Sequence, residues 1–159
     1  MAGNDKDERL FKNILFPTDC AKGSEDAAVY ARSLTRQYGA RLIVLHVVDN
    51  AIEASGFYVP HMSYEKLDED EESAEARELR KYCIRLFGGV KDCCESIILS
   101  GEPHVEILKV AAQKDIDLIV MGSGERSGVD SLFFGSTAKK VLKRSTVPVL
   151  IVPPSNSSV

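Results

Sequence analysis

The sequence predicts a single-domain α/β fold, in which an open, twisted, parallel sheet of five strands carries helices on both faces. Three observations predict this fold. Short apolar runs alternate with segments of helical periodicity, the pattern of strand–helix–strand units. The apolar runs are continuous, as expected for strands that are buried on both faces. The 159 residues, 44% hydrophobic and 28% charged, suffice for one domain with its own core.

The first predicted strand follows an N-terminal segment, residues 1–10, that we expect to be flexible. The run KNILFPTD, residues 12–19, is apolar and ends in turn residues, which is typical of a strand. A helix is predicted next, with Ser24 as its N-cap and Gly39 at its end. One face of this helix collects small or apolar residues: Ala27, Ala31, Leu34 and Tyr38.

The second strand and second helix are separated by a predicted loop. ARLIVLHVVD, residues 40–49, is continuously apolar and predicts a strand, and residues 50–62 predict the loop. Residues 63–87 are highly charged and predict a helix. Their acidic residues come early and their basic residues late, which suits the helix dipole. We interpret the acidic run as a solvated helix face rather than a partner-binding site.

The remaining elements continue the alternation. CCESIILS, residues 93–100, predicts the third strand, and Pro103 fits the first turn of the helix after it. The expected inner side of that helix is Val105, Leu108, Ala111 and Ala112. IDLIVMG, residues 116–122, predicts the fourth strand, and a helix is expected from Gly135 or Ser136. VPVLIVP, residues 147–153, predicts the fifth strand, and residues 154–159 predict a disordered tail.

Composition limits the possible partners. The net charge is −4 and no basic stripe is present, so we expect no nucleic-acid partner. The N-terminus has no apolar run typical of a signal peptide, and no stretch approaches the roughly 20 apolar residues that span a bilayer. We therefore predict a cytoplasmic protein without a membrane partner. The three histidines are expected to be packed and hydrogen-bonded.

The four cysteines contain no CxxC pair. In a cytoplasmic protein we expect them to be reduced thiols that pack in a core, rather than a redox or metal site. They are Cys20, Cys83, Cys93 and Cys94.

Three segments are expected to meet at the carboxyl edge of the sheet, where open α/β sheets bind ligands. They are residues 17–19, 46–49 and 121–128. The third begins a longer run, MGSGERSGVDSLFFGST, that looks like a phosphate-holding loop. Its glycines would let backbone N–H groups approach a phosphate closely. The helix that starts at Gly135 or Ser136 would add its N-terminal dipole and hydroxyl groups.

Six segments occur in a characteristic order: ILFPTDCAKGSEDAAVYA, LHVVD, SGEPHVEILKVA, DLIVMGS, FFGSTAKKVL and VPVLIVP. Together they make the chain resemble the universal stress protein family over residues 11–153. The resemblance implies strand order 3-2-1-4-5 and an adenine-nucleotide site. It also implies a homodimer that pairs through residues 147–153, and an apolar edge strand is a sensible place for such pairing.

The family's nucleotide motif is Gly-x2-Gly-x9-Gly-Ser/Thr. Here it falls on Gly122, Gly135 and Ser136, but the second glycine is replaced by Glu125. A carboxylate about 4 Å from a phosphate costs roughly 4 kcal/mol at an effective dielectric constant of about 20. If position 125 also needs a glycine conformation, a side chain there costs about 1 kcal/mol or more. Two neighbours can offset these two costs. Gly124 would restore the freedom of the loop, and Arg126 would supply a cation.

The resemblance also implies the nucleoside contacts. Asp19 would contact the nucleoside, and the backbone of Val47 would pair with adenine. The other predicted pocket residues are Pro17, Thr18, Met121, Ser123 and Thr137. Two structural interpretations stay open. Asp19 is a residue type that favours turn and helix caps, and glycines also serve tight turns without any ligand.

The implied function is a regulator or sensor in the stress response that binds ATP, ADP or AMP, with Mg²⁺ only if ATP is bound. No catalytic residue is predicted, and ATP hydrolysis would at most be slow. The P-loop pattern is absent. Cys20 is a weak thiolate candidate because the arginine of a phosphatase loop is missing at position 26. The alternative function, favoured by Glu125, is a nucleotide-independent dimeric interaction module with unknown protein partners.

Overall fold

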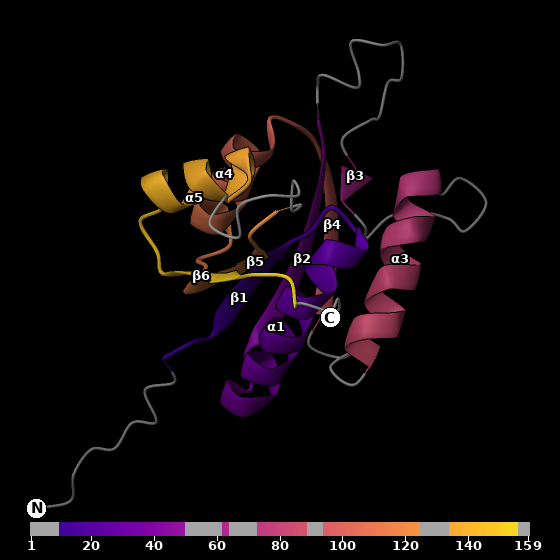
Figure 1. Ribbon diagram of the computed structural model, residues 1–159. Helices are drawn as coiled ribbons and strands as arrows, with labels where there is room; N and C mark the ends of the chain where they lie inside the picture. The colour runs from indigo at the N-terminus through magenta and orange to yellow at the C-terminus, as the bar shows by residue number, and fades with distance from the viewer. Residues whose placement is uncertain (1–9, 50–61, 64–72, 89–93, 125–133, 156–159) are drawn as a thin grey trace, which may run out of the picture.

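The computed structural model describes residues 10–49, 62–63, 73–88, 94–124 and 134–155, and its centre is one β-sheet (Figure 1). Five parallel strands lie in the order β4 (Cys94–Gly101), β2 (Arg41–Asp49), β1 (Asn13–Pro17), β5 (Leu118–Gly122) and β6 (Val149–Val152). Numbered among themselves, these strands give the predicted order 3-2-1-4-5, which confirms the predicted fold class. A two-residue strand, β3 (Met62–Ser63), pairs antiparallel with β4.

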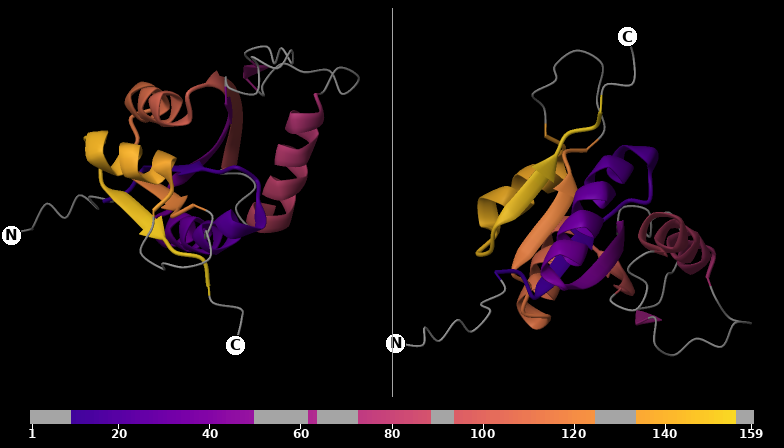
Figure 2. Two further views of the ribbon diagram at one scale, coloured as in Figure 1. Left: turned by 45° about the horizontal axis from the view of Figure 1, so that its top comes forward. Right: turned by 90° about the horizontal axis from the view of Figure 1, so that it is seen from below.

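Helices cover both faces of the sheet (Figure 2). α1 (Glu25–Tyr38) and α3 (Ala74–Phe87) pack side by side on one face. α4 (Pro103–Gln113) and α5 (Ser136–Arg144) cover the other. Within the described ranges, no helix is long and apolar enough to cross a membrane.

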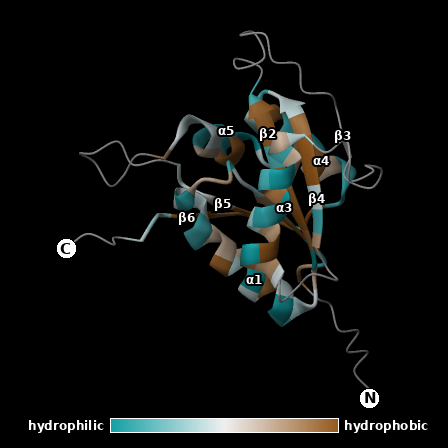
Figure 3. Cartoon of the chain, turned by 90° about the vertical axis from the view of Figure 1, so that its right-hand side faces the viewer, coloured by the Kyte–Doolittle hydropathy of each residue, from teal (hydrophilic) through white to brown (hydrophobic). Residues whose placement is uncertain are grey.

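Two apolar cores result, one on each face. Alternate strand residues supply them, because successive side chains of a strand point to opposite faces. Phe16 and Val44 lie in the core beneath α1 and α3, whereas Leu15 and Ile43 lie in the core beneath α4 and α5. α1 and α3 mix hydrophilic and hydrophobic residues, as expected for helices that cover a core (Figure 3). Burial of these alternating side chains therefore holds the helices on the sheet.

The ends of α1 follow different rules. Gly39 has φ 59° and ψ 35°, and its N–H bonds the carbonyl of Thr35, so the predicted glycine stop is confirmed. Ser24 stands at the N-cap position, but its side chain does not cap the helix. A 3₁₀ turn, η1 (Lys22–Ser24), precedes α1, and the Ser24 hydroxyl is engaged elsewhere.

α4 begins at Pro103 as predicted, but of its predicted inner face only Ala111 is buried. The buried residues are His104, Ile107, Val110 and Ala111. His104 occupies the apolar stripe because its ring has partners for both nitrogens. Nδ1 lies 3.1 Å from the Glu102 carboxylate, and Nε2 lies 3.0 Å from the Arg144 guanidinium. His104 is thus packed and hydrogen-bonded, as expected for the histidines.

The sheet topology creates a recess at the carboxyl edge. β1 pairs with β2 only as far as Pro17 opposite Leu45, so β2 continues past the end of β1. The connection after β1 leads to α1 on one face of the sheet, and the connection after β5 leads to α5 on the other face. Such a switch in direction is where α/β sheets bind ligands.

Candidate functional site

A cavity of about 280 Å³ opens at this edge of the sheet. Its volume lies near the lower end of the roughly 300–1,000 Å³ of small-molecule sites. The predicted residues that line it are Pro17, Thr18, Asp19, Val47, Met121, Gly122, Gly124, Gly135, Ser136 and Thr137. Ser123 is buried between two of these residues, and Arg126 and Glu125 lie outside the described residues. The fold therefore brings together segments that lie far apart in the chain.

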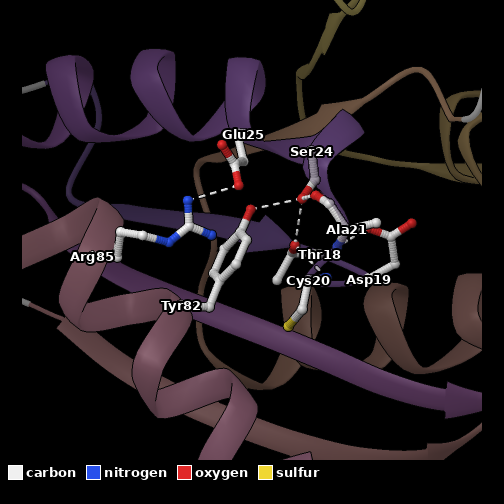
Figure 4. Close-up of polar contacts among 8 residues, drawn as sticks. All are labelled: Thr18, Asp19, Cys20, Ala21, Ser24, Glu25, Tyr82 and Arg85. Atoms are coloured by element: carbon white, nitrogen blue, oxygen red, sulfur yellow. Dashed lines mark hydrogen bonds and ion pairs between the residues drawn. The ribbon is translucent and has the colours of Figure 1, made fainter.

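Asp19 occupies the exposed rim of the cavity. Its Oδ1 accepts a hydrogen bond of 2.9 Å from the N–H of Ala21 (Figure 4). The turn-cap interpretation of Asp19 is therefore correct for one carboxylate oxygen. The residue also lines the cavity, and a carboxylate has acceptor capacity beyond that single bond.

Three buried hydroxyl groups form a network behind the cavity. The Ser24 hydroxyl donates to the carbonyl of Ala21 at 2.8 Å. Since its only proton is used there, its oxygen accepts from Thr18 at 2.9 Å and from Tyr82 at 2.6 Å (Figure 4). Burial raises the pKa of the Tyr82 phenol, so Tyr82 stays a donor. The network ties the cavity wall to α3.

Cys20 lies next to this network in a left-handed conformation, with φ 61°. Its N–H donates to the Thr18 hydroxyl oxygen at 2.9 Å. Burial, followed by the nearby charges of Asp19 and Glu78, raises the pKa of the Cys20 thiol to about 11. The idea that this position stabilises a thiolate is therefore wrong, because desolvation and acidic neighbours outweigh the nearby helix start.

Glycines shape the opposite wall of the cavity. Gly124 has φ +101°, which favours glycine, and a Cβ there would lie 3.0 Å from the Cα of Gly135. Gly135 in turn donates its N–H to the carbonyl of Ser123 at 2.6 Å. The chain thus leaves β5 and returns to α5 at almost the same point. Gly124 was expected to give the loop its freedom, and it has the positive φ that favours glycine.

α5 begins at Ser136, as predicted, and its first turn faces the cavity. Gly135 is the N-cap and has no side chain that could satisfy the first N–H groups. Such N–H groups and the dipole of the helix favour an anion. The hydroxyls of Ser136 and Thr137 add donors at the same place. The arrangement fits a phosphate.

Sequence reasoning missed several walls of the cavity: Ala21, Gly23, Ser24, Pro103, Ile107 and Ala138. Pro103 and Ile107 come from the first turns of α4, the helix that connects β4 to β5. Ala21, Gly23 and Ser24 belong to the turn between β1 and α1. Their nearness in the sequence to the predicted residues Pro17–Asp19 could have indicated that they line the cavity. Among the described lining residues, Asp19 alone carries an ionisable side chain.

Comparison with known proteins gives a consistent result. The model of the universal stress protein family matches residues 10–153. Universal stress protein MJ0531 of Methanocaldococcus jannaschii is 34% identical over 91% of this chain and 84% of its own. The solved structure of protein MJ0577, from the same organism, has a TM-score of 0.71 at 28% identity, covering 93% of this chain and 99% of that one. A universal stress protein in complex with cAMP has a TM-score of 0.65 at 21% identity, covering 91% of this chain and 98% of that one.

Proposed function

Because the chain belongs to the universal stress protein family, we propose that it binds an adenine nucleotide at the carboxyl edge of the sheet. We propose further that it acts as a regulator or sensor in the stress response, without efficient catalysis. ATP, ADP and AMP are the candidate ligands, and Mg²⁺ would accompany ATP only.

The observation that carries this proposal is the junction of Gly124, Gly135 and the start of α5. Gly124 and Gly135 bring two stretches of backbone together beside the first turn of a helix. This combination suits a phosphate, because N–H groups and the helix dipole replace a cationic side chain. A larger residue at position 124 would disturb it.

The adenosine part of the ligand would lie between β1 and β2. Val47, Met121 and Ile107 offer apolar surface for a base. The Asp19 carboxylate, on the rim, would accept hydrogen bonds from ribose hydroxyls. One protein of this fold has been solved with cAMP, so the architecture is able to hold an adenine nucleotide.

The proposal of weak or absent catalysis rests on the chemistry of the described cavity walls. Hydrolysis of ATP needs a positioned water and electrostatic stabilisation of the transferred phosphoryl group. Among the described lining residues, the only candidate for a general base is Asp19, and it lies on the rim beside the end of β1. A binding role fits these walls better than rapid turnover.

Titration calorimetry tests the proposal. Nucleotide-stripped wild-type protein is titrated with ATP, ADP and AMP, with and without Mg²⁺. We expect micromolar binding of at least one nucleotide. Asp19→Asn keeps the Oδ1 acceptor but removes the charge, so we expect affinity to fall about 10-fold or more, the effect of losing a hydrogen bond to a charged group.

Two variants interpret the titration. Asp115→Asn makes the same charge change at the opposite, amino edge of the sheet and should leave affinity unchanged. Asp115 has φ 50°, a conformation that asparagine also tolerates. Glu125→Gly restores the family motif and should raise affinity. Absence of wild-type binding that is restored in Glu125→Gly would refute the nucleotide role and support the dimeric interaction module.

A further inference from the structure

His104 is a buried histidine at the contact between α4 and α5. It lies in the first turn of α4 and is 4% exposed. Its Nδ1 lies 3.1 Å from Oε1 of Glu102, and its Nε2 lies 3.0 Å from Nη1 of Arg144. Arg144 is the last residue of α5, so the ring connects the start of one helix with the end of the other. The imidazole is thus held between a carboxylate and a guanidinium group.

These two neighbours determine which ring nitrogen carries the proton. A guanidinium group has only N–H donors, so Nε2 must accept through its lone pair. An ionised carboxylate only accepts, so the ring hydrogen belongs on Nδ1, where it faces Glu102. In this arrangement His104 is therefore a neutral imidazole whose proton sits on Nδ1.

A second proton on the ring breaks one contact and keeps the other. The charged ring carries an N–H on Nε2, which then meets the N–H groups of Arg144, and two positive charges face each other. Arg144 is exposed, so its side chain is able to turn away into solvent. Nδ1 still faces Glu102, and that contact becomes an ion pair. Protonation therefore separates the end of α5 from α4 while the ring stays beside the start of its own helix.

Other charged groups surround the contact on the two helices. Lys140 of α5 lies 3.3 Å from Oε1 of Glu102, the same oxygen that faces the ring. On α4 itself, Glu106 pairs with Lys109 at 2.9 Å. Glu102 favours a charged ring, whereas Arg144 and Lys140 oppose it. The protonation of the ring thus depends on neighbours of opposite sign.

The strands beneath α4 carry two further carboxylates. α4 packs on β2 and β4, and strand alternation places Asp49 and Glu95 on the α4 side of the sheet. Asp49 ends β2 opposite Gly101, near the start of α4. Glu95 pairs with Lys114 at the other end of that helix, at 2.8 Å. Asp49 therefore adds to the charges that favour protonation of His104.

We propose that His104 is a proton-sensitive joint between α4 and α5. The neutral ring holds Arg144 against α4, and a proton on Nε2 releases it. Histidine suits this role because its charge ordinarily changes between about pH 5 and 8. Both helices wall the cavity, α4 through Pro103 and α5 through its first turn, so the joint makes these walls responsive to pH. The inference rests on the contacts of His104 and not on the proposed nucleotide function.

NMR spectroscopy of the full-length protein without ligand tests the tautomer first. A long-range correlation between ring carbon-bound hydrogens and ring nitrogens reports which nitrogen is protonated. At about pH 8, above the ordinary range of histidine, we expect the His104 ring to be neutral with its proton on Nδ1. A ring protonated on Nε2 under this condition would overturn the proposal.

A pH titration of the ring then tests the two neighbours separately. Arg144→Met keeps a long side chain but removes the opposing cation, so the midpoint of His104 should move to higher pH. Glu102→Gln removes the favouring carboxylate, so the midpoint should move to lower pH. We expect each protonation constant to change about threefold or more, because both neighbours lie within about 4 Å of the ring. A midpoint that is the same in wild type and Arg144→Met would contradict the joint.

Two controls accompany this titration. Lys143→Met removes the same charge one residue earlier on α5 and should leave the His104 midpoint nearly unchanged. His46 is an internal reference, since its Nδ1 lies 2.9 Å from the carbonyl oxygen of Thr18 and its midpoint should agree in all variants. Circular dichroism checks that each variant is folded.

The backbone amide signals of α5 report the release itself. In the wild type, the signals of residues 141–144 should shift with the same midpoint as the His104 ring, because Arg144 leaves its contact there. Arg144→Met should lose most of this response although its ring still titrates, while Lys143→Met should respond like the wild type. An equal response in wild type and Arg144→Met would show that protonation does not act on α5 through Arg144.

Discussion

Gly124 has both a left-handed backbone and a crowded neighbour, which makes it the most restricted glycine at the cavity. Its φ is +101°, and an added Cβ would lie 3.0 Å from the Cα of Gly135. We expect Gly124→Ala to reduce the free energy of unfolding by about 1–3 kcal/mol, from backbone strain and the contact together. Urea denaturation measures this loss directly.

Gly88 provides the matched control for this substitution. A Cβ at Gly88 would meet nothing within 4 Å, and its φ is −53°. Gly88→Ala should therefore leave stability unchanged or raise it slightly, because alanine reduces the freedom of the unfolded chain. Equal losses in the two variants would show that the geometry at Gly124 is not the cause.

A buried hydroxyl of helix α3 bonds the turn after β1. Tyr82 donates to Ser24 at 2.6 Å, and the Arg85 guanidinium lies 5.7 Å from the Tyr82 ring centroid while pairing with Glu25 (Figure 4). Tyr82→Phe keeps the ring and removes the hydroxyl. We expect a loss of about 1–2 kcal/mol in the free energy of unfolding, since one buried hydrogen bond disappears.

Tyr38→Phe, at the end of α1, is the matched control for Tyr82→Phe. The Tyr38 ring makes an edge contact with Phe11, with centroids 5.0 Å apart, and phenylalanine preserves this contact. Its stability in urea should stay near that of the wild type. If Tyr82→Phe is as stable as Tyr38→Phe, the hydroxyl network does not hold α3 in place.

The whole molecule presents β6 at one side of its sheet, where it pairs with β5. Val149, Leu150 and Ile151 are partly exposed there. We propose that two copies pair through this strand, and we expect the wild type to sediment as a dimer. Ile151→Lys should shift sedimentation towards the monomer or destabilise the fold, because a charge enters an apolar edge.

Leu142→Lys is the corresponding control on α5. Leu142 is 49% exposed on α5 and does not belong to the edge strand. The variant should sediment like the wild type, and circular dichroism separates loss of pairing from loss of fold in Ile151→Lys. A wild-type protein that sediments as a monomer at all concentrations would contradict the dimer.

The parts of the fold that follow from neighbouring residues were predictable. Gly39 ends α1 and Ser136 starts α5 because capping depends on the local chain. The prediction that Ser24 caps α1 was wrong, because its hydroxyl bonds Tyr82, which lies 58 residues away in the chain. Part of the inner face of α4 was predicted wrongly because His104, a polar residue, finds partners for both ring nitrogens, the nearby Glu102 and the distant Arg144.

In the candidate site too, features set by neighbouring residues were predictable and features set by distant residues were not. Residues that follow strands were correctly placed at the cavity, because parallel strands end at a common edge. The walls from α4 could not be predicted, since Pro103 and Ile107 reach the cavity only through the three-dimensional path of the crossover. The strand β3 also depends on pairing with a distant partner, Ile97–Ile98 of β4.

The hydrogen bond from Gly135 to Ser123 fixes both ends of the intervening chain at one place. The free energy of closing a loop rises slowly with length, by about 0.6 kcal/mol for each doubling. Because Ser123 and Gly135 are held together, we expect a change in the number of residues between them to cost the fold little free energy. The hydrogen bond between Gly135 and Ser123 thus makes this connection a suitable place for lengthening the chain in an engineered variant.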